Sequence, residues 1–254
     1  MVNPLAHGQA GKSTREMARK RYQKLYLLAG AMAAVVILLI SNINRLARFG
    51  LPAVIVVALC VKIVVDLLHQ KGLAVKKRAK DADRGATAEE KVAVRLSDLP
   101  EGYQGFHDID FNCFNIDHVV VALAGIFLIE TKSHRGKVAA EGDSLLLNGV
   151  PPEKNFLNQT WSQTKNLEEF LYKMTSKEWK VKPVICFTNA YVDVRRPVKG
   201  ITVTSIGYLN RYLSKQPAAM KAEEVERLCR VLSSWLSRHE REKKSCEFDG
   251  VPRL

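Results

Sequence analysis

The stretch that decides the fold is residues 116–132, which read IDHVVVALAGIFLIETK. Two runs rich in β-branched and aromatic residues, 116–122 and 126–132, are separated by a few residues that include Gly125. Such runs, joined by a short connection with glycine, predict the two strands of a β-hairpin. Side chains two apart on a strand point to the same face, so we expect Glu130 and Lys132 to project together.

The segments around this hairpin alternate between helical and strand patterns. Apolar spacing predicts helices over residues 87–99, 156–174 and 225–236, and a short helix that ends near residue 213. Strands are predicted over residues 105–111, 137–147, 184–188 and 201–205. The predicted fold class is therefore α/β, with a mixed sheet flanked by helices.

Asp117 adds a second carboxylate to the hairpin. If Ala124 and Gly125 form a two-residue connection, Asp117 lies opposite Lys132 and on the face of Glu130. Carboxylates on a valine-rich strand need a compensating partner, and a divalent cation held by oxygen ligands is one. A lysine beside such a cation suits phosphodiester hydrolysis, because it orients water and stabilises charge on the phosphate. The E-x-K pattern alone is common on exposed strands, so the prediction depends on the hairpin.

Two predicted helices offer further polar side chains. The first helix offers a carboxylate, Glu89 or Glu90, and in this interpretation Glu89 completes a metal shell or orients a ligand of the metal. On the later helix, Gln159 and Gln163 contact a phosphate or position the lysine. The alternative for each of these four is an ordinary exposed helix residue.

These motifs together resemble a known family. The resemblance rests on the following residues: 85–89 (GATAE) with Val92, 115–121 (NIDHVVV), 125–132 (GIFLIETK), Gly136 and Gln159. They resemble the nuclease-related (NERD) domain, of the PD-(D/E)xK restriction-endonuclease-like superfamily, over about residues 85–190.

The resemblance implies a restriction-endonuclease-like fold and an active-site set, which consists of Glu89, Asp117, Glu130 and Lys132, with Gln159 as the accompanying glutamine. It also implies Mg²⁺ or Mn²⁺ as the cofactor, held by Asp117, Glu130 and Glu89, and DNA or RNA as the substrate.

The histidines and cysteines carry weaker predictions. His118 follows Asp117 in the strand, so we expect it on the opposite face, packed or in solvent. His134 either approaches the scissile phosphate or is an exposed loop residue. The five cysteines are scattered without a C-x-x-C pair, which predicts neither a zinc site nor a redox motif and fits a reducing cytoplasm.

The basic charge is concentrated near the N-terminus. Residues 1–70 carry a net charge of +7 and residues 71–84 a net charge of +4, whereas residues 85–254 carry only +2. Most of the excess is therefore a topology signal beside membrane segments, and the total of +13 is a poor argument for nucleic acid.

Two apolar blocks, residues 25–43 and 51–68, are each long enough to span a membrane as a helix. The second block contains Lys62 and Asp66, which are four residues apart and can pair on one helix face. Basic residues flank both outer ends, while the short connection holds only Arg45 and Arg48. This predicts a two-helix transmembrane hairpin in the cytoplasmic membrane, with both termini and the nuclease-like domain in the cytoplasm. The alternative is one true span, a buried or interfacial second helix, and an external domain.

The predicted organisation has five parts: a basic N-terminus (1–24), the transmembrane hairpin (25–68), a basic linker or helix extension (69–84), the nuclease-like domain (85–215), and a C-terminal amphipathic helix with a tail (216–254). Three functions stay open: a membrane-anchored nuclease, a catalytically silent module that binds nucleic acid or a protein partner, and an oligomeric transporter or channel component.

Overall fold

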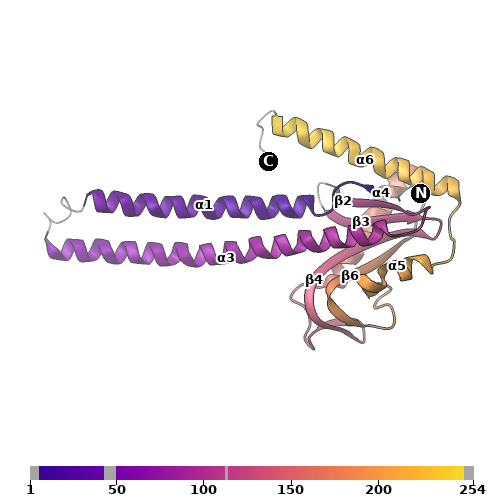
Figure 1. Cartoon of the computed structure of the whole chain (residues 1–254), viewed down its shortest axis with the longest axis horizontal. Coiled ribbons are helices and arrows are strands. Elements are labelled where there is room, and N and C mark those ends of the chain that lie inside the picture. The colour runs from indigo at the N-terminus through magenta and orange to yellow at the C-terminus, as the bar shows by residue number, and fades with distance from the viewer. Residues whose placement is uncertain (1–5, 43–49, 112–113, 249–254) are drawn as a thin grey trace. The chain divides into compact units, whose positions relative to one another are not determined.

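The computed structural model describes residues 6–42, 50–111 and 114–248 of the chain (Figure 1). The chain divides into two compact units. One consists of Ser13–Arg84, and the other of Met1–Lys12 together with Gly85–Leu254. Each unit is described by itself below.

The helical unit consists of most of α1 (Lys12–Ser41) and the first part of α3 (Leu51–Ser97). Two contacts far apart in sequence join these helices: Arg15 forms an ion pair with Asp83 at 3.5 Å, and the Arg21 guanidinium donates to the Arg78 carbonyl at 2.7 Å. The helices therefore run side by side in opposite directions. Residues 69–84, predicted as a linker or helix extension, are helical throughout.

One described helix segment, Lys12–Leu38, has the length and apolarity of a membrane span. None of its apolar stretch is buried against the rest of the described structure. The second predicted span includes residues 51, 53 and 54, whose side chains lie outside the described residues, as does the connection with Arg45 and Arg48. The predicted two-span hairpin is therefore not confirmed.

The other unit is built on a seven-stranded sheet. Its strands are β1 (Ala6–His7), β2 (Gln104–Asp110), β3 (Asn115–Ala122), β4 (Gly125–Glu141), β5 (Ser144–Leu147), β6 (Val181–Asp193) and β7 (Thr202–Ser205). The order is β1-β2-β3-β4-β6-β7, with β5 paired to β4. The β2–β3 and β3–β4 pairs are antiparallel, whereas β4–β6 and β6–β7 are parallel. The predicted mixed α/β sheet is thus confirmed.

The register of the central hairpin differs from the prediction. Ala122 pairs with Gly125, so the two connecting residues are Leu123 and Ala124. Since His118 pairs with Ile129, the same register sets Asp117 beside Glu130 and not opposite Lys132. The predicted connection was wrong because a shift of two residues leaves every side chain on the same face, so the apolar alternation cannot distinguish the two registers.

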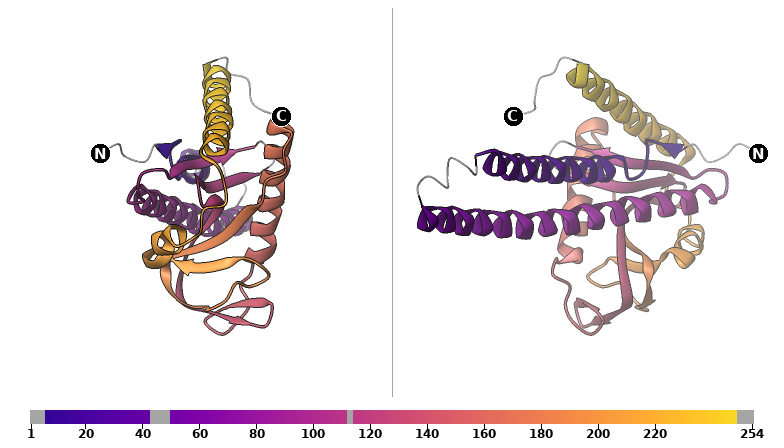
Figure 2. Two further views of the ribbon diagram at one scale, coloured as in Figure 1. Left: turned by 90° about the vertical axis from the view of Figure 1, so that its right-hand side faces the viewer. Right: turned by 60° about the vertical axis from the view of Figure 1, so that its left-hand side comes forward.

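Helices cover both faces of the sheet (Figure 2, left). On one face, α4 (Phe156–Thr175) and α6 (Ala222–Phe248) pack on β2, β3 and β4 through Val119, Leu167 and Leu228. On the other face, the end of α3 and helix α5 (Ile206–Ser214) pack on β4 and β6, through Val92, Phe127 and Leu209 among others. The strict alternation of β3 and β4 separates these two cores and places Asp117 and Glu130 on the α4 side.

Candidate active site

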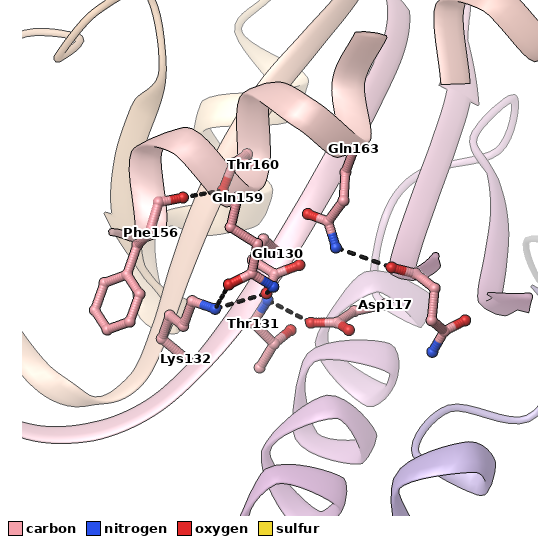
Figure 3. A network of polar contacts seen from close by, with 9 residues as sticks. Asp117, Glu130, Thr131, Lys132, Phe156, Gln159, Thr160 and Gln163 are labelled. Atoms are coloured by element: carbon pink, nitrogen blue, oxygen red, sulfur yellow. Dashed lines mark hydrogen bonds and ion pairs between the residues drawn. The ribbon is translucent and has the colours of Figure 1, made fainter. Parts of the chain in front are cut away.

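Three side chains form a closed hydrogen-bonded triangle (Figure 3). Lys132 Nζ donates to Glu130 Oε1 at 2.6 Å and to Gln159 Oε1 at 3.0 Å. Gln159 Nε2 in turn donates to the same Glu130 oxygen at 2.7 Å. Each side chain thus holds the other two in one orientation, and the expectation that Glu130 and Lys132 project together is met.

The triangle exists because a strand and a helix meet there. Alternation on β4 brings Glu130 and Lys132 to the α4 face, and Gln159 lies in the first turn of α4. Asn155 caps that helix by accepting a hydrogen bond from the Asn158 amide at 3.0 Å, which fixes where the first turn begins. Glu130 and Lys132 are 4% and 9% exposed, so their ion pair lies largely out of water.

Asp117 joins this cluster from the neighbouring strand. Its Oδ2 accepts a hydrogen bond from the Thr131 backbone amide at 2.7 Å. This bond links β3 to β4 directly next to Glu130. Burial raises the pKa of the Asp117 carboxyl well above its usual value, and the negative charges of Glu130 and Glu89 raise it further. The Thr131 amide and Lys132 act in the opposite direction but do not balance these effects.

Glu89 reaches the site from a different layer. It is buried on α3, and its charge acts on Asp117, although α3 packs on the sheet face opposite to α4. Among the described residues, no group of three or more His, Cys, Asp and Glu side chains is arranged to hold a metal ion. The carboxylates of Asp117 and Glu130 lie on the α4 face of the sheet, whereas Glu89 approaches them from the other face.

The remaining predicted polar residues have separate surroundings. Gln163, one turn after Gln159, donates from Nε2 to the Asn115 carbonyl at 2.8 Å and forms no hydrogen bond with Lys132 within the described ranges. His118 lies on the face opposite to Asp117, as expected, and its Nδ1 is 2.9 Å from Nδ1 of His107. His134 is exposed, with its ring centroid 5.1 Å from that of Phe156.

Sequence reasoning missed two features of the site. The first is the role of Phe156, whose ring lies 4.8 Å from Lys132 Nζ and shields one side of the ammonium. The second is a break in the β4–β6 register between Lys132 and Arg135, directly after the site. No signal in the sequence marks this bulge, but the position of Phe156 just before Gln159 follows from the predicted helix start.

A helix-flanked mixed sheet, with an aspartate, a glutamate and a lysine on two adjacent strands, is the arrangement expected of restriction-endonuclease-like α/β domains. In agreement, the family model of the nuclease-related domain matches residues 84–188. This part of the chain is a nuclease-related domain, and it contains all five predicted site residues. No curated protein and no solved structure gives a significant match to the chain.

Proposed function

We propose that this protein is a metal-dependent nuclease that hydrolyses phosphodiester bonds in DNA or RNA. The observation that carries the proposal is the buried Glu130–Lys132–Gln159 triangle with Asp117 on the adjacent strand. A purely structural role does not account for it, because burying a carboxylate and an ammonium in a core is unfavourable compared with apolar packing.

The acidic residues fit a divalent cation. Glu130 Oε2 is buried and has no hydrogen-bond partner within the described part of the chain. Burial first, and then the charges of Glu130 and Glu89, raise the pKa of the Asp117 carboxyl, and the Lys132 ammonium does not offset them. Asp117 and Glu130 would hold Mg²⁺ or Mn²⁺, with Glu89 as the third acidic group nearby. When bound, such a cation supplies an activated water and Lewis-acid stabilisation of the phosphate.

The chain's own residues then perform three tasks. Lys132 holds a positive charge at a fixed place beside the cation-binding carboxylates, where it orients the attacking water and stabilises negative charge that develops on the phosphate. Gln159 is a positioning residue, because it restrains both partners of the ion pair. Phe156 covers one side of the ammonium and keeps water from it, which strengthens the electrostatic effect.

A surface for nucleic acid follows the site along β4 and β6. Beyond the bulge, Arg135 pairs with Asn189 and Lys137 with Tyr191, so these four side chains lie on one face of the two strands. That face is exposed, and it offers the Arg135 guanidinium and the Tyr191 ring within a few residues of Lys132, while Lys137 is ion-paired with Asp193 at 2.8 Å. Cations that follow the backbone together with a stacking ring are typical of sites for single-stranded nucleic acid.

The test is a cleavage assay with the full chain in detergent, on labelled single-stranded and double-stranded DNA and RNA, with Mg²⁺, Mn²⁺ or EDTA. We expect cleavage that EDTA abolishes and that Glu130→Gln reduces by about 100-fold or more. Glu141→Gln is the matched control, because Glu141 is an exposed glutamate on the same strand. Equal cleavage by the Glu130 variant and the parent would exclude the proposal.

A catalytically silent binding module is the second candidate. It is favoured by the net charge of only +2 over residues 85–254, because nuclease grooves usually carry a larger basic excess. This alternative predicts that the chain binds a protein partner with little dependence on salt, and that Asp117→Asn leaves this binding unchanged.

Attachment to a bilayer is part of the proposal. In the helical unit, apolar side chains on α1 and α3 face outward, among them Ile37, Leu38, Val56, Leu59 and Ile63. Water disfavours such a surface, and lipid tails do not. We place the N-terminal helices in the cytoplasmic membrane, as a two-pass hairpin with the nuclease-related domain on the cytoplasmic side. Protease protection in inverted and right-side-out vesicles tests this topology, and a domain cleaved only from outside would contradict it.

A further inference from the structure

Gln163 presents a buried oxygen that no described residue satisfies. The residue is 7% exposed, and its Nε2 donates to the Asn115 carbonyl at 2.8 Å. Its Oε1 is buried without a hydrogen-bond partner anywhere in the described ranges. Gln163 lies one turn after Gln159 on α4, so it extends the row of polar groups that faces Glu130.

The orientation of this amide is fixed by its partner. A backbone carbonyl can only accept a hydrogen bond, so the amide group near Asn115 must be the donor NH₂. Exchanging the two ends of the amide would bring two acceptors together at Asn115. The oxygen of Gln163 must therefore point elsewhere, and in the view of Figure 3 it lies on the side of the amide that is nearer Glu130.

A second unsatisfied oxygen belongs to the same side of the sheet. Glu130 uses Oε1 for both Lys132 and Gln159, while its Oε2 is also buried without a partner in the described structure. An amide oxygen and a carboxylate oxygen repel each other, and neither can donate. Buried acceptors require a donor or a cation, and a cation bound between the two would satisfy both oxygens.

We infer that Gln163, through Oε1, is an oxygen ligand of the divalent cation that Asp117 and Glu130 hold. This inference rests on the proposed function and adds a ligand to its site. It also fits the absence of any three-membered group of acidic, histidine and cysteine ligands from the described chain, because an amide supplies the third oxygen on the α4 face. Hard cations accept amide oxygens alongside carboxylates.

Two substitutions of Gln163 distinguish a role as metal ligand from a purely structural role. Gln163→Met removes both the oxygen and the donor to Asn115, whereas Gln163→Glu keeps an oxygen and removes only the donor. If Gln163 serves only to hold Asn115, the two variants are equally impaired. If its oxygen binds the cation, the glutamate variant retains binding and the methionine variant does not.

The experiment measures Mn²⁺ binding to the full chain in detergent, by electron paramagnetic resonance of the free ion. We expect Gln163→Met to raise the dissociation constant for Mn²⁺ by about tenfold or more. We expect Gln163→Glu to bind Mn²⁺ as tightly as the parent or more tightly. Thr164→Val is the matched control, since among the described residues the Thr164 hydroxyl donates only to the Thr160 carbonyl of the same helix, at 2.7 Å. Circular dichroism and tryptophan fluorescence report the folding of each variant.

Two results would overturn the inference: parent-like Mn²⁺ affinity in Gln163→Met, or equal weakening in both Gln163 variants. Glu130→Gln distinguishes this failure from a failure of the proposed function. If Glu130→Gln loses Mn²⁺ and Gln163→Met keeps it, only the role of Gln163 is wrong. If Glu130→Gln also binds Mn²⁺ like the parent, the proposed metal site itself is wrong. Should Gln163→Met fail to fold, Gln163→Glu decides: affinity below the parent's rejects the ligand role.

Discussion

Asp117 and His118 are neighbours on β3, but their side chains enter opposite faces of the sheet and meet different surroundings. His118 meets another histidine, His107, and the two rings share one hydrogen bond between Nδ1 atoms at 2.9 Å. Burial lowers the pKa of both rings, so both stay neutral. Asp117 instead meets the charges of Glu130 and Glu89, with Lys132 as the nearby cation.

The difference is one of charge. The histidine face, formed by His107 and His118, carries no charge that needs a partner, although His118 Nε2 is also buried without a hydrogen-bond partner in the described part of the chain. The acidic face, formed by Asp117, Glu130 and Lys132, has more carboxylates than ammonium groups. We therefore expect a divalent cation to stabilise the acidic face and not the histidine face.

The largest expected effect follows from removing the ammonium. Lys132→Met should reduce cleavage by about 100- to 1000-fold, the usual range for one charge-stabilising group. The same variant should bind Mn²⁺ at least as tightly as the parent, because a competing positive charge beside Glu130 is gone. A gel assay and calorimetric titration measure the two quantities. Mn²⁺ binding lost together with cleavage would show that Lys132 holds the site together and has no separate chemical role.

The next effect concerns the pH dependence of the histidine face. The folded pKa of His107 is lowered from 6.5 to about 4 by burial and by the charge of His7, so the unfolded chain binds more protons than the folded chain in that range. The free energy of unfolding should therefore fall as the pH drops below 6.5, with about 3 kcal/mol lost near pH 4 through His107 alone, and the lowered pKa of His118 adds to this loss.

Chemical unfolding followed by tryptophan fluorescence measures this dependence, because all three tryptophans lie in residues 85–254. His107→Phe should make the pH profile less steep without abolishing it, because the buried His118 ring still has a lowered pKa, and the variant also leaves Nδ1 of His118 without its partner. A profile of unchanged slope would mean that His107 is protonated in the folded protein.

A smaller effect is expected at Asp117. Because its folded pKa is raised, the folded metal-free protein retains a proton that the unfolded chain loses, and stability falls as the pH rises through this range. Asp117→Asn keeps an oxygen acceptor for the Thr131 amide and removes the charge. We expect it to raise the free energy of unfolding of the metal-free protein at pH 7 by on the order of 1 kcal/mol. Destabilisation in EDTA would contradict the electrostatic account of this face.

The smallest effect should come from outside both clusters. Arg135→Ala removes one exposed cation from the face beyond the bulge, and should weaken binding of a single-stranded oligonucleotide only a few-fold. The dependence of log affinity on log salt should become shallower by about 0.7. Lys173→Ala on α4, where Lys173 pairs with Glu169, is the control. An unchanged salt dependence would remove this face from the proposed path of the strand.

Sequence reasoning reached the acidic face but not the histidine pair. The β-branched runs and the E-x-K spacing were enough to predict the hairpin and the shared face of Glu130 and Lys132, because both depend only on alternation. The His107–His118 contact depends on the register between β2 and β3, which no local pattern specifies.

Four other features also lay beyond local patterns. The two-residue strand β1 pairs with β2 from almost 100 positions away in the chain, and two residues are too few to show a period. The bulge after Lys132 and the turn at Leu123–Ala124 both concern register, which apolar patterning leaves open. The orientation of Gln163 requires knowing that the Asn115 carbonyl lies within reach of its amide.

The most direct measurement of the central claim is thermal unfolding of the full chain with and without Mn²⁺, for the parent and for the double variant Asp117→Asn, Glu130→Gln. We predict that Mn²⁺ raises the unfolding temperature of the parent by several degrees, and that the shift grows with pH as Asp117 loses its proton. The double variant should show no shift. An equal shift in both proteins, or none in either, would contradict the account.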